Sequence, residues 1–198
     1  MSSQSPRPQL ILASSSPYRR ELLARFRIPF TCRPPSVVET PRPGEAAMEL
    51  TRRLAAAKAR DVATRFPGSL VIGSDQLAEL EGQLMGKPGS EEQAVGQLMR
   101  CSGRQLTFLT AVAVVRKDPV FFQEFLVPTT VEYRPFSEDE ARRYVALDRP
   151  LDCAGAVKSE AAGPMLLNRV ESSDPTALIG LPLIRLAAVL RLAGLELP

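Results

Sequence analysis

In Leu70–Gln76 (LVIGSDQ), a run of strand-forming apolar residues meets a glycine and then a carboxylate. We expect a buried strand that ends at Asp75-Gln76, because continuous apolar runs are typical of strands covered on both faces. Such a strand brings its last residues to the edge of a sheet, where α/β proteins commonly bind their ligands. Asp75 is therefore the candidate catalytic residue. The alternative is that Ser74 and Asp75 only cap a turn.

The bulk composition is that of an ordinary globular protein. The chain has 198 residues, of which 44% are hydrophobic and 24% charged, with a net charge of +3 and a pI near 9.0. This length suits one compact domain or two small lobes around a cleft. The basic residues are dispersed in pairs and aromatics make up 6%, so the sequence disfavours an RNA-binding domain.

The absence of histidine is the most useful exclusion. It removes Ser-His-Asp and Cys-His catalysis and all histidine-ligated metals. The three cysteines form neither a disulfide framework nor a zinc signature, which favours a reducing compartment. No apolar run reaches membrane length and no signal-peptide core precedes the first strand, so we expect a cytoplasmic protein that contacts no membrane.

Near the N-terminus the sequence predicts a strand, a tight loop and a helix. Residues 1–8 form a loose tail, Leu10–Ala13 is a short buried strand, and Ser16 and Pro17 suit the N-cap and first position of a helix. Arg19 and its neighbour Arg20 lie in the first turn, where the helix dipole disfavours cations. That placement indicates an anion site at the helix start; alternatively, both arginines point into water.

The next helix, from about Glu45 to Phe66, carries an unusual lysine. Apolar residues recur every four positions, and Lys58 interrupts their stripe. A buried ammonium must be paired or must reach a polar cavity, unless the side chain extends to the surface. The preceding proline-rich connector, Arg33–Glu45, is long enough to line a cleft and contains Glu39.

The rest of the chain predicts a mixed α/β pattern. We expect a hairpin of 77–80 with 83–86, a hairpin of 106–115 with 120–133, and loops at 149–162 and 168–174. Capping boxes at Ser90 and Ser137 start two helices. A terminal helix starts at Asp174-Pro175, is interrupted at Gly180–Pro182 and continues to about Leu192.

Six blocks stand in order along the chain: Leu12–Leu23 (LASSSPYRRELL), Ile72–Gln76, Gly86–Pro88, Ser102-Gly103, Asp152–Gly155 with Lys158–Glu160, and Asp174 with Gly180–Pro182. Together, over Leu10 to Leu192, they resemble the Maf family of nucleoside triphosphate pyrophosphatases.

The resemblance implies hydrolysis of a nucleotide between its α- and β-phosphates, with a divalent cation, Mg²⁺ or Mn²⁺. It implies a single domain over 1–198: an α/β fold with a mixed twisted sheet, flanking helices and two lobes around a central cleft, like inosine triphosphatases. A homodimer is implied as well. The matching residues are Asp75 as the base, Glu39 and Asp75 as metal ligands, and on the phosphates Ser14, Arg19, Lys58 and Lys87. Family members carry more acid before Glu39 than the Ser36–Val38 found here.

Three positions that read the base differ between subfamilies, and here they are Tyr18, Gln76 and Glu160. This combination is similar to the 7-methyl-GTP subfamily and differs from the Arg, Thr and Gln of the dTTP/UTP subfamily. A methylated guanine is cationic, so an aromatic ring can stack on it and a carboxylate can accept from its N1–H and N2–H₂ edge. Taken without the resemblance, Tyr18 is a core or surface aromatic and Glu160 a solvated acid. Two other functions stay open: the same chemistry on dTTP or UTP, and a nucleotide-sensing regulator of cell division without turnover.

Overall fold

The computed structural model describes residues 8–198, so the predicted tail lies, apart from Pro8, outside the described residues. Two compact units divide the chain. Among the described residues, unit 1 comprises 8–75, 111–126 and 180–198, and unit 2 comprises 76–110 and 127–179. No helix within residues 8–198 is long and apolar enough to cross a membrane.

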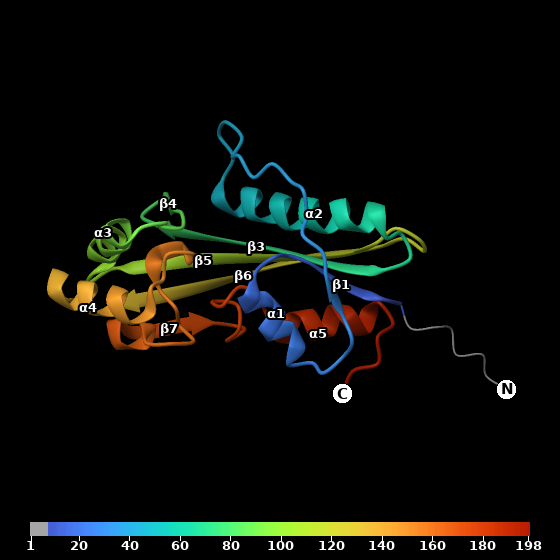
Figure 1. Cartoon of the computed structure of the whole chain (residues 1–198). Helices are drawn as coiled ribbons and strands as arrows, with labels where there is room; N and C mark the ends of the chain where they lie inside the picture. The colour runs from blue at the N-terminus through green and yellow to red at the C-terminus, as the bar shows by residue number, and fades with distance from the viewer. Residues whose placement is uncertain (1–7) are drawn as a thin grey trace. The chain divides into compact units, whose positions relative to one another are not determined.

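The elements alternate in the order expected of an α/β protein (Figure 1). The helices are α1 (Pro17–Ala24), α2 (Ala47–Arg65), α3 (Glu91–Cys101), α4 (Glu138–Asp148), η1 (Ala154–Ala156), η2 (Gly163–Leu166) and α5 (Leu183–Leu192). The strands are β1 (Leu10–Ala13), β2 (Thr31–Cys32), β3 (Leu70–Leu80), β4 (Gln83–Met85), β5 (Gln105–Arg116), β6 (Phe121–Tyr133) and β7 (Leu167–Ser172). They form one seven-stranded sheet in the order β2-β1-β3-β5-β6-β7, with β4 paired to β3. Because β1 pairs parallel with β3 while β7 pairs antiparallel with β6, the predicted mixed sheet is confirmed.

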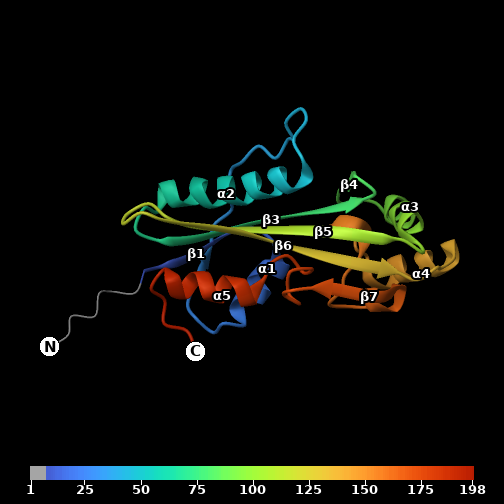
Figure 2. The same cartoon turned by 180° about the vertical axis from the view of Figure 1, so that it is seen from behind.

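In unit 1, helices cover both faces of the strands: α2 lies on one face, and α1 and α5 lie on the other (Figures 1 and 2). β1 is buried along its whole length, as a parallel strand between two covered faces should be. Its register with β3 runs from Leu10 opposite Leu70 to Ala13 opposite Gly73. The α2 face is filled by small and branched side chains such as Ala59, Val62 and Val71.

Gly73 sets the distance between α2 and β3. A Cβ atom at Gly73 would lie 2.4 Å from the Ala55 carbonyl oxygen and 2.6 Å from the Ala59 nitrogen, both on α2. These are backbone atoms that cannot move aside without moving the helix. The glycine therefore allows α2 to approach β3 closely, which is a frequent role for glycine in a strand interior.

The end predicted for the strand at Leu70–Gln76 is wrong. β3 does not stop at Asp75-Gln76 but continues to Leu80, so Asp75 lies in the interior of an 11-residue strand. What ends near this point is the pairing with β1, which stops at Gly73. Asp75 thus lies two residues after the last parallel pair and stays buried, at 5% exposure.

Unit 2 has its own core and two capped helices. Its largest buried side chains include Leu98, Phe108 and Tyr133, and α3 packs against α4. The predicted β3–β4 hairpin is confirmed, with Glu81 and Gly82 both at positive φ in its turn. Both predicted N-caps are confirmed; Ser137 forms a complete capping box, whereas Ser90 shows only its own side-chain acceptor.

Two other boundaries were wrong. The predicted loop at 168–174 contains all of β7 but its first residue. The residues of β7 are nearly all exposed, so no buried alternation marks the strand in the sequence. The terminal helix starts at Leu183 and not at Asp174-Pro175. The residues before it form turns, and Gly180 takes a φ of +117° that no helix allows.

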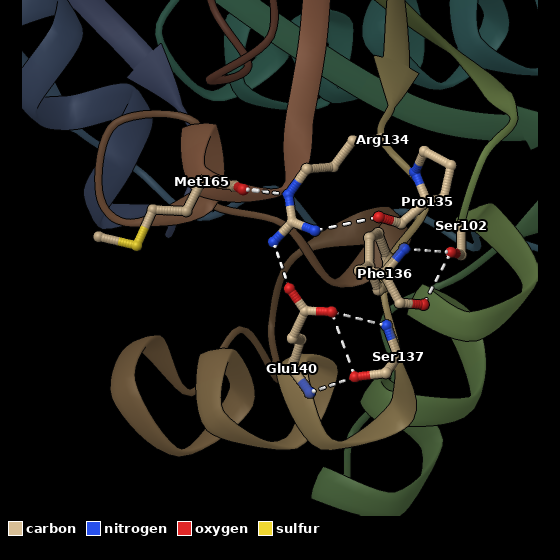
Figure 3. Close-up of polar contacts among 7 residues, drawn as sticks. All are labelled: Ser102, Arg134, Pro135, Phe136, Ser137, Glu140 and Met165. Atoms are coloured by element: carbon tan, nitrogen blue, oxygen red, sulfur yellow. Dashed lines mark hydrogen bonds and ion pairs between the residues drawn. The ribbon is translucent and has the colours of Figure 1, made fainter.

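Arg134 ties together the end of β6, the start of α4 and η2 (Figure 3). Its Nε donates to the Met165 carbonyl oxygen at 2.8 Å, and its Nη2 donates to Glu140 Oε1 at 2.8 Å. The other oxygen of Glu140 accepts from the Ser137 backbone N–H at 2.9 Å. These bonds lower the pKa of Glu140 to about 2, chiefly through the Ser137 N–H and then Arg134.

Candidate active site

The centre of the candidate site is a buried ion pair in unit 1. Lys58 Nζ donates to Asp75 Oδ1 at 2.7 Å and lies 2.7 Å from Glu39 Oε1. Lys58 and Asp75 are 7% and 5% exposed, whereas the Glu39 side chain is 59% exposed. One lysine therefore joins a strand carboxylate to the proline-rich connector. The expectation that Lys58 is paired is confirmed, and the alternative that it extends to the surface is wrong.

The periodic patterns of α2 and β3 place Lys58 and Asp75 on facing surfaces. Leu50, Leu54 and Val62 share the buried face of α2 with Lys58. On β3, alternation places Gly73 and Asp75 on the same face, the one that α2 covers. The close approach at Gly73 thus brings Lys58 to Asp75.

Burial dominates the electrostatics of Asp75. It raises the pKa of the carboxyl group, and the nearby charges of Lys58 and Arg19 act in the opposite direction. Asp75 Oδ1 binds Lys58, but the second oxygen, Oδ2, is buried and has no hydrogen-bond partner among the described residues. A buried carboxylate oxygen without a partner is costly, which indicates that a ligand, water or cation completes it.

The start of α1 forms the second part of the site. Ser16 caps the helix by accepting from the Arg19 backbone N–H at 3.4 Å, and Ser14 Oγ accepts from the Ser16 N–H at 3.1 Å. The predicted strand, loop and capped helix are thus confirmed. Arg20 is exposed, as the solvent alternative expects, whereas Arg19 is partly buried. Tyr18 is partly buried in the same first turn.

Arg19 and Ser74 share one acceptor. Arg19 Nε donates to the Gly180 carbonyl oxygen at 3.0 Å, and Ser74 Oγ donates to the same oxygen at 2.9 Å. Burial lowers the pKa of Arg19, and the charges of Asp75 and Glu39 partly offset that effect. Arg19 is thus within electrostatic reach of both carboxylates.

The remaining candidates belong to unit 2, where no hydrogen bond or ion pair joins Gln76, Lys87 and Glu160 to one another in the described part of the chain. Lys87 and Glu160 are exposed. The Gln76 amide nitrogen donates to Thr110 Oγ1 at 2.9 Å and to the carbonyls of Ala177 and Leu178 at 2.9 and 3.0 Å.

The segment that carries Glu160 is folded back on itself. The Lys158 carbonyl oxygen accepts from the Ala161 and Gly163 N–H groups, at 3.2 and 3.0 Å. Asp148, at the end of α4, accepts from the Ala162 N–H through its carboxylate and from Lys158 Nζ through its carbonyl. A Cβ atom at Gly163 would lie 2.3 Å from the Lys158 carbonyl oxygen, so this closure requires glycine.

Sequence reasoning missed Ser74, Thr110 and Gly180. Ser74 was interpreted only as a possible turn cap, and Gly180 only as an interruption of a helix. Both act through contacts more than 100 residues apart in sequence, which no local pattern reveals. Within residues 8–198, no three acidic or cysteine side chains gather as a metal-binding group.

Comparison with known proteins finds similar solved structures and similar sequences. The Staphylococcus aureus Ham1 protein superposes with a TM-score of 0.48 and 16% identity, covering 78% of this chain and 89% of that one. A protein named 7-methyl-GTP pyrophosphatase from Pseudomonas aeruginosa is 51% identical over 191 residues, which are 96% of this chain and 100% of the relative. Another of the same name from Aromatoleum aromaticum is 53% identical over 190 residues, covering 96% and 98%.

The sequence pattern of the Maf-like protein family matches residues 9–193, nearly the whole chain. The matched region contains the strand with Asp75, the helix with Lys58 and the capped start of α1. The chain belongs to the Maf family.

Proposed function

We propose that this protein hydrolyses 7-methyl-GTP to 7-methyl-GMP and diphosphate. The observation that carries the chemistry is the buried Asp75 carboxylate, one oxygen of which is held by Lys58 while the other has no partner among the described residues. The substrate is supported by relatives that bear the name 7-methyl-GTP pyrophosphatase and share about half of their residues with this chain over nearly its full length.

In this proposal Asp75 is the general base. Water attacks the α-phosphorus, its proton passes to Asp75 Oδ2, and the bond to the bridging oxygen breaks as diphosphate leaves. Burial raises the pKa of Asp75, which makes the carboxylate a stronger base than an exposed one. Phosphoryl transfer depends mainly on positioning and charge neutralisation, so Lys58 and Arg19 stabilise the charge on the phosphates. Ser14 and Lys87 are proposed as further phosphate contacts.

The residues present fit one divalent cation, Mg²⁺ or Mn²⁺. Asp75 Oδ2 is a buried anionic oxygen with no partner among the described residues, and Glu39 supplies a second carboxylate on the same lysine. A carboxylate oxygen has two lone pairs, so one of Oδ2 could face the cation while the other accepts the proton of the water. Mg²⁺ is usually held by one or two carboxylates together with substrate phosphates and water, so a third protein carboxylate is not required. When bound, the cation would neutralise phosphate charge and favour departure of diphosphate.

Three side chains are proposed to read the methylated base. Tyr18 would stack on the cationic ring, a contact of about 1–2 kcal/mol when water is excluded. Glu160 would accept from the N1–H and N2–H₂ edge. Because the Gln76 amide nitrogen is already used by three acceptors of the protein, its carbonyl oxygen is the atom that we assign to the base.

The test is diphosphate release from 7-methyl-GTP, GTP, dTTP and UTP with Mg²⁺. We expect 7-methyl-GTP to give the highest kcat/KM. Equal or faster hydrolysis of dTTP or UTP would reject the substrate assignment, and no release from any of the four would favour a nucleotide-sensing protein. A cytoplasmic location and a homodimer stay predictions; light scattering of the purified protein tests the latter.

A further inference from the structure

The Gly180 carbonyl oxygen joins two segments of unit 1 that flank the ion pair. It accepts from Arg19 Nε at 3.0 Å and from Ser74 Oγ at 2.9 Å. Ser74 is fully buried and directly precedes Asp75 in the chain. A carbonyl oxygen has two lone pairs, and here both are engaged. One backbone atom thus fixes both the arginine of α1 and the strand residue beside the proposed base.

Gly180 reaches this position through a backbone conformation that other residues avoid. Its φ is +117°, outside the regions that L-residues populate readily. A Cβ atom there would also contact Arg19, at 3.4 Å from Nε and 3.8 Å from Cγ. An alanine would therefore move the backbone off this φ and with it the carbonyl oxygen.

Holding Arg19 by Nε determines what its other nitrogens can do. The guanidinium is planar and presents its five N–H donors in a rigid fork. Nε is used by Gly180, while Nη1 and Nη2 donate to no group in the described part of the chain. The side chain lies within electrostatic reach of Asp75 and Glu39. The two terminal nitrogens are thus oriented donors of the kind that bind phosphate in a bidentate manner.

We infer that Gly180 is a positioning residue for hydrolysis, whose carbonyl oxygen orients the Arg19 guanidinium toward the phosphates and fixes Ser74 beside Asp75. This inference rests on the proposed function, because it assigns Arg19 to the substrate phosphates. It adds a backbone group, contributed by the turn before α5, to a site otherwise made of side chains.

The first experiment compares Gly180→Ala with Gly194→Ala. Both glycines have positive φ, +117° and +91°, but a Cβ at Gly194 would meet nothing within 4 Å. We expect Gly180→Ala to lower kcat/KM for 7-methyl-GTP roughly ten- to a hundredfold, as a misplacement of about 1 Å does. Gly194→Ala should change it less than about twofold. Equal effects of the two variants would overturn the inference.

A second comparison separates positioning of Arg19 from general damage. In an Arg19→Ala background, Gly180→Ala should cost less than about a further threefold, because residues that act through one another are non-additive. The same loss in both backgrounds would contradict a role through Arg19. Melting curves of all variants establish that each is folded.

A third comparison leaves Gly180 intact and so holds even if its variant does not fold. Arg19→Lys keeps the charge but removes the Nε–H, and it should weaken both kcat/KM and the binding of inorganic tripolyphosphate by roughly tenfold. Arg20→Lys is the matched control on the exposed side of α1. Wild-type tripolyphosphate affinity in Arg19→Lys would overturn the inference. A protein that binds tripolyphosphate through Arg19 yet hydrolyses no nucleotide would overturn the proposed function alone.

Discussion

Lys58 and Asp75 form a buried ion pair that bears both on the stability of the fold and on the proposed chemistry. Each charge taken out of water carries a desolvation cost of several kcal/mol, which their mutual attraction must offset. The offset is incomplete on one atom, because Asp75 Oδ2 finds no partner among the described residues. A site that leaves a buried oxygen unsatisfied is prepared for a ligand, at a cost to the folded state.

Breaking the pair should be strongly destabilising. Lys58→Met leaves the Asp75 carboxylate buried without its lysine, so urea unfolding should show a loss of about 3–5 kcal/mol. In the double variant with Asp75→Asn, the two losses should overlap, with a coupling energy of about 1–3 kcal/mol.

The control cycle uses Asp61 and Arg65, an exposed pair on the same helix at 2.8 Å. Its coupling should be only about 0.3–0.5 kcal/mol. If the coupling energy between Lys58 and Asp75 is no larger than that of this control pair, the buried pair is not energetically coupled.

For single residues, the sequence predicted what a periodic pattern can reveal. Lys58 stood out because it interrupts an apolar stripe, and an ammonium there needs a partner. The partner itself was not predicted, because the resemblance gave Lys58 only as a phosphate contact; the structure pairs Lys58 with Asp75. Gly180 gave no such signal, since its function resides in a backbone oxygen and a chain reversal.

Among the elements, the contact of α2 with β3 determines the site. Gly73 permits that contact, so Gly73→Ala should force the helix away from the strand and destabilise the protein by about 1–3 kcal/mol in urea unfolding. Lys58 is next to Ala59 on the helix that would be displaced, so its contact with Asp75 should be disturbed. Diphosphate release should therefore fall as well. Gly68→Ala, where a Cβ would meet nothing within 4 Å, is the control. Equal stability of the two variants would refute this role for Gly73.

Element boundaries were predictable where capping side chains mark them. Ser16, Ser90 and Ser137 each start a helix at the expected position. β7 was missed because it is exposed and polar, and its pairing with β6 depends on a distant partner. The predicted end of β3 came too early because a glycine followed by polar residues is typical of a strand end. In the structure, Gly73 instead allows the close approach of α2.

For the whole molecule, each unit contains a carboxylate whose pKa is lowered to about 2. Glu45 in unit 1 is held chiefly by Arg53, and Glu140 in unit 2 by the Ser137 N–H and Arg134. A lowered pKa in the folded state means that protonation favours unfolding. The contribution is complete above the unfolded pKa of about 4.3 and is lost as the pH falls from there toward 2.

The melting temperature should therefore decrease as the pH falls from about 5 toward 2, and the double variant Glu45→Gln with Glu140→Gln should flatten that decrease. Glu138→Gln, which removes an exposed i,i+4 partner of Arg142, is the control and should leave the slope nearly unchanged. A double variant with the wild-type slope would show that other groups set the acid limit.

The role of Asp75 as the base is tested by the Asp75→Asn variant, assayed for both diphosphate release and binding of 7-methyl-GTP. Asparagine keeps an oxygen for Lys58 but replaces the proposed proton-accepting oxygen with an amide. If Asp75 is the base, kcat should fall by about 10²–10⁴-fold while the nucleotide still binds. Asp139→Asn, at an exposed carboxylate on α4, should have the activity of the wild type. Turnover by Asp75→Asn within a few fold of the wild type would contradict the assignment of Asp75 as the base.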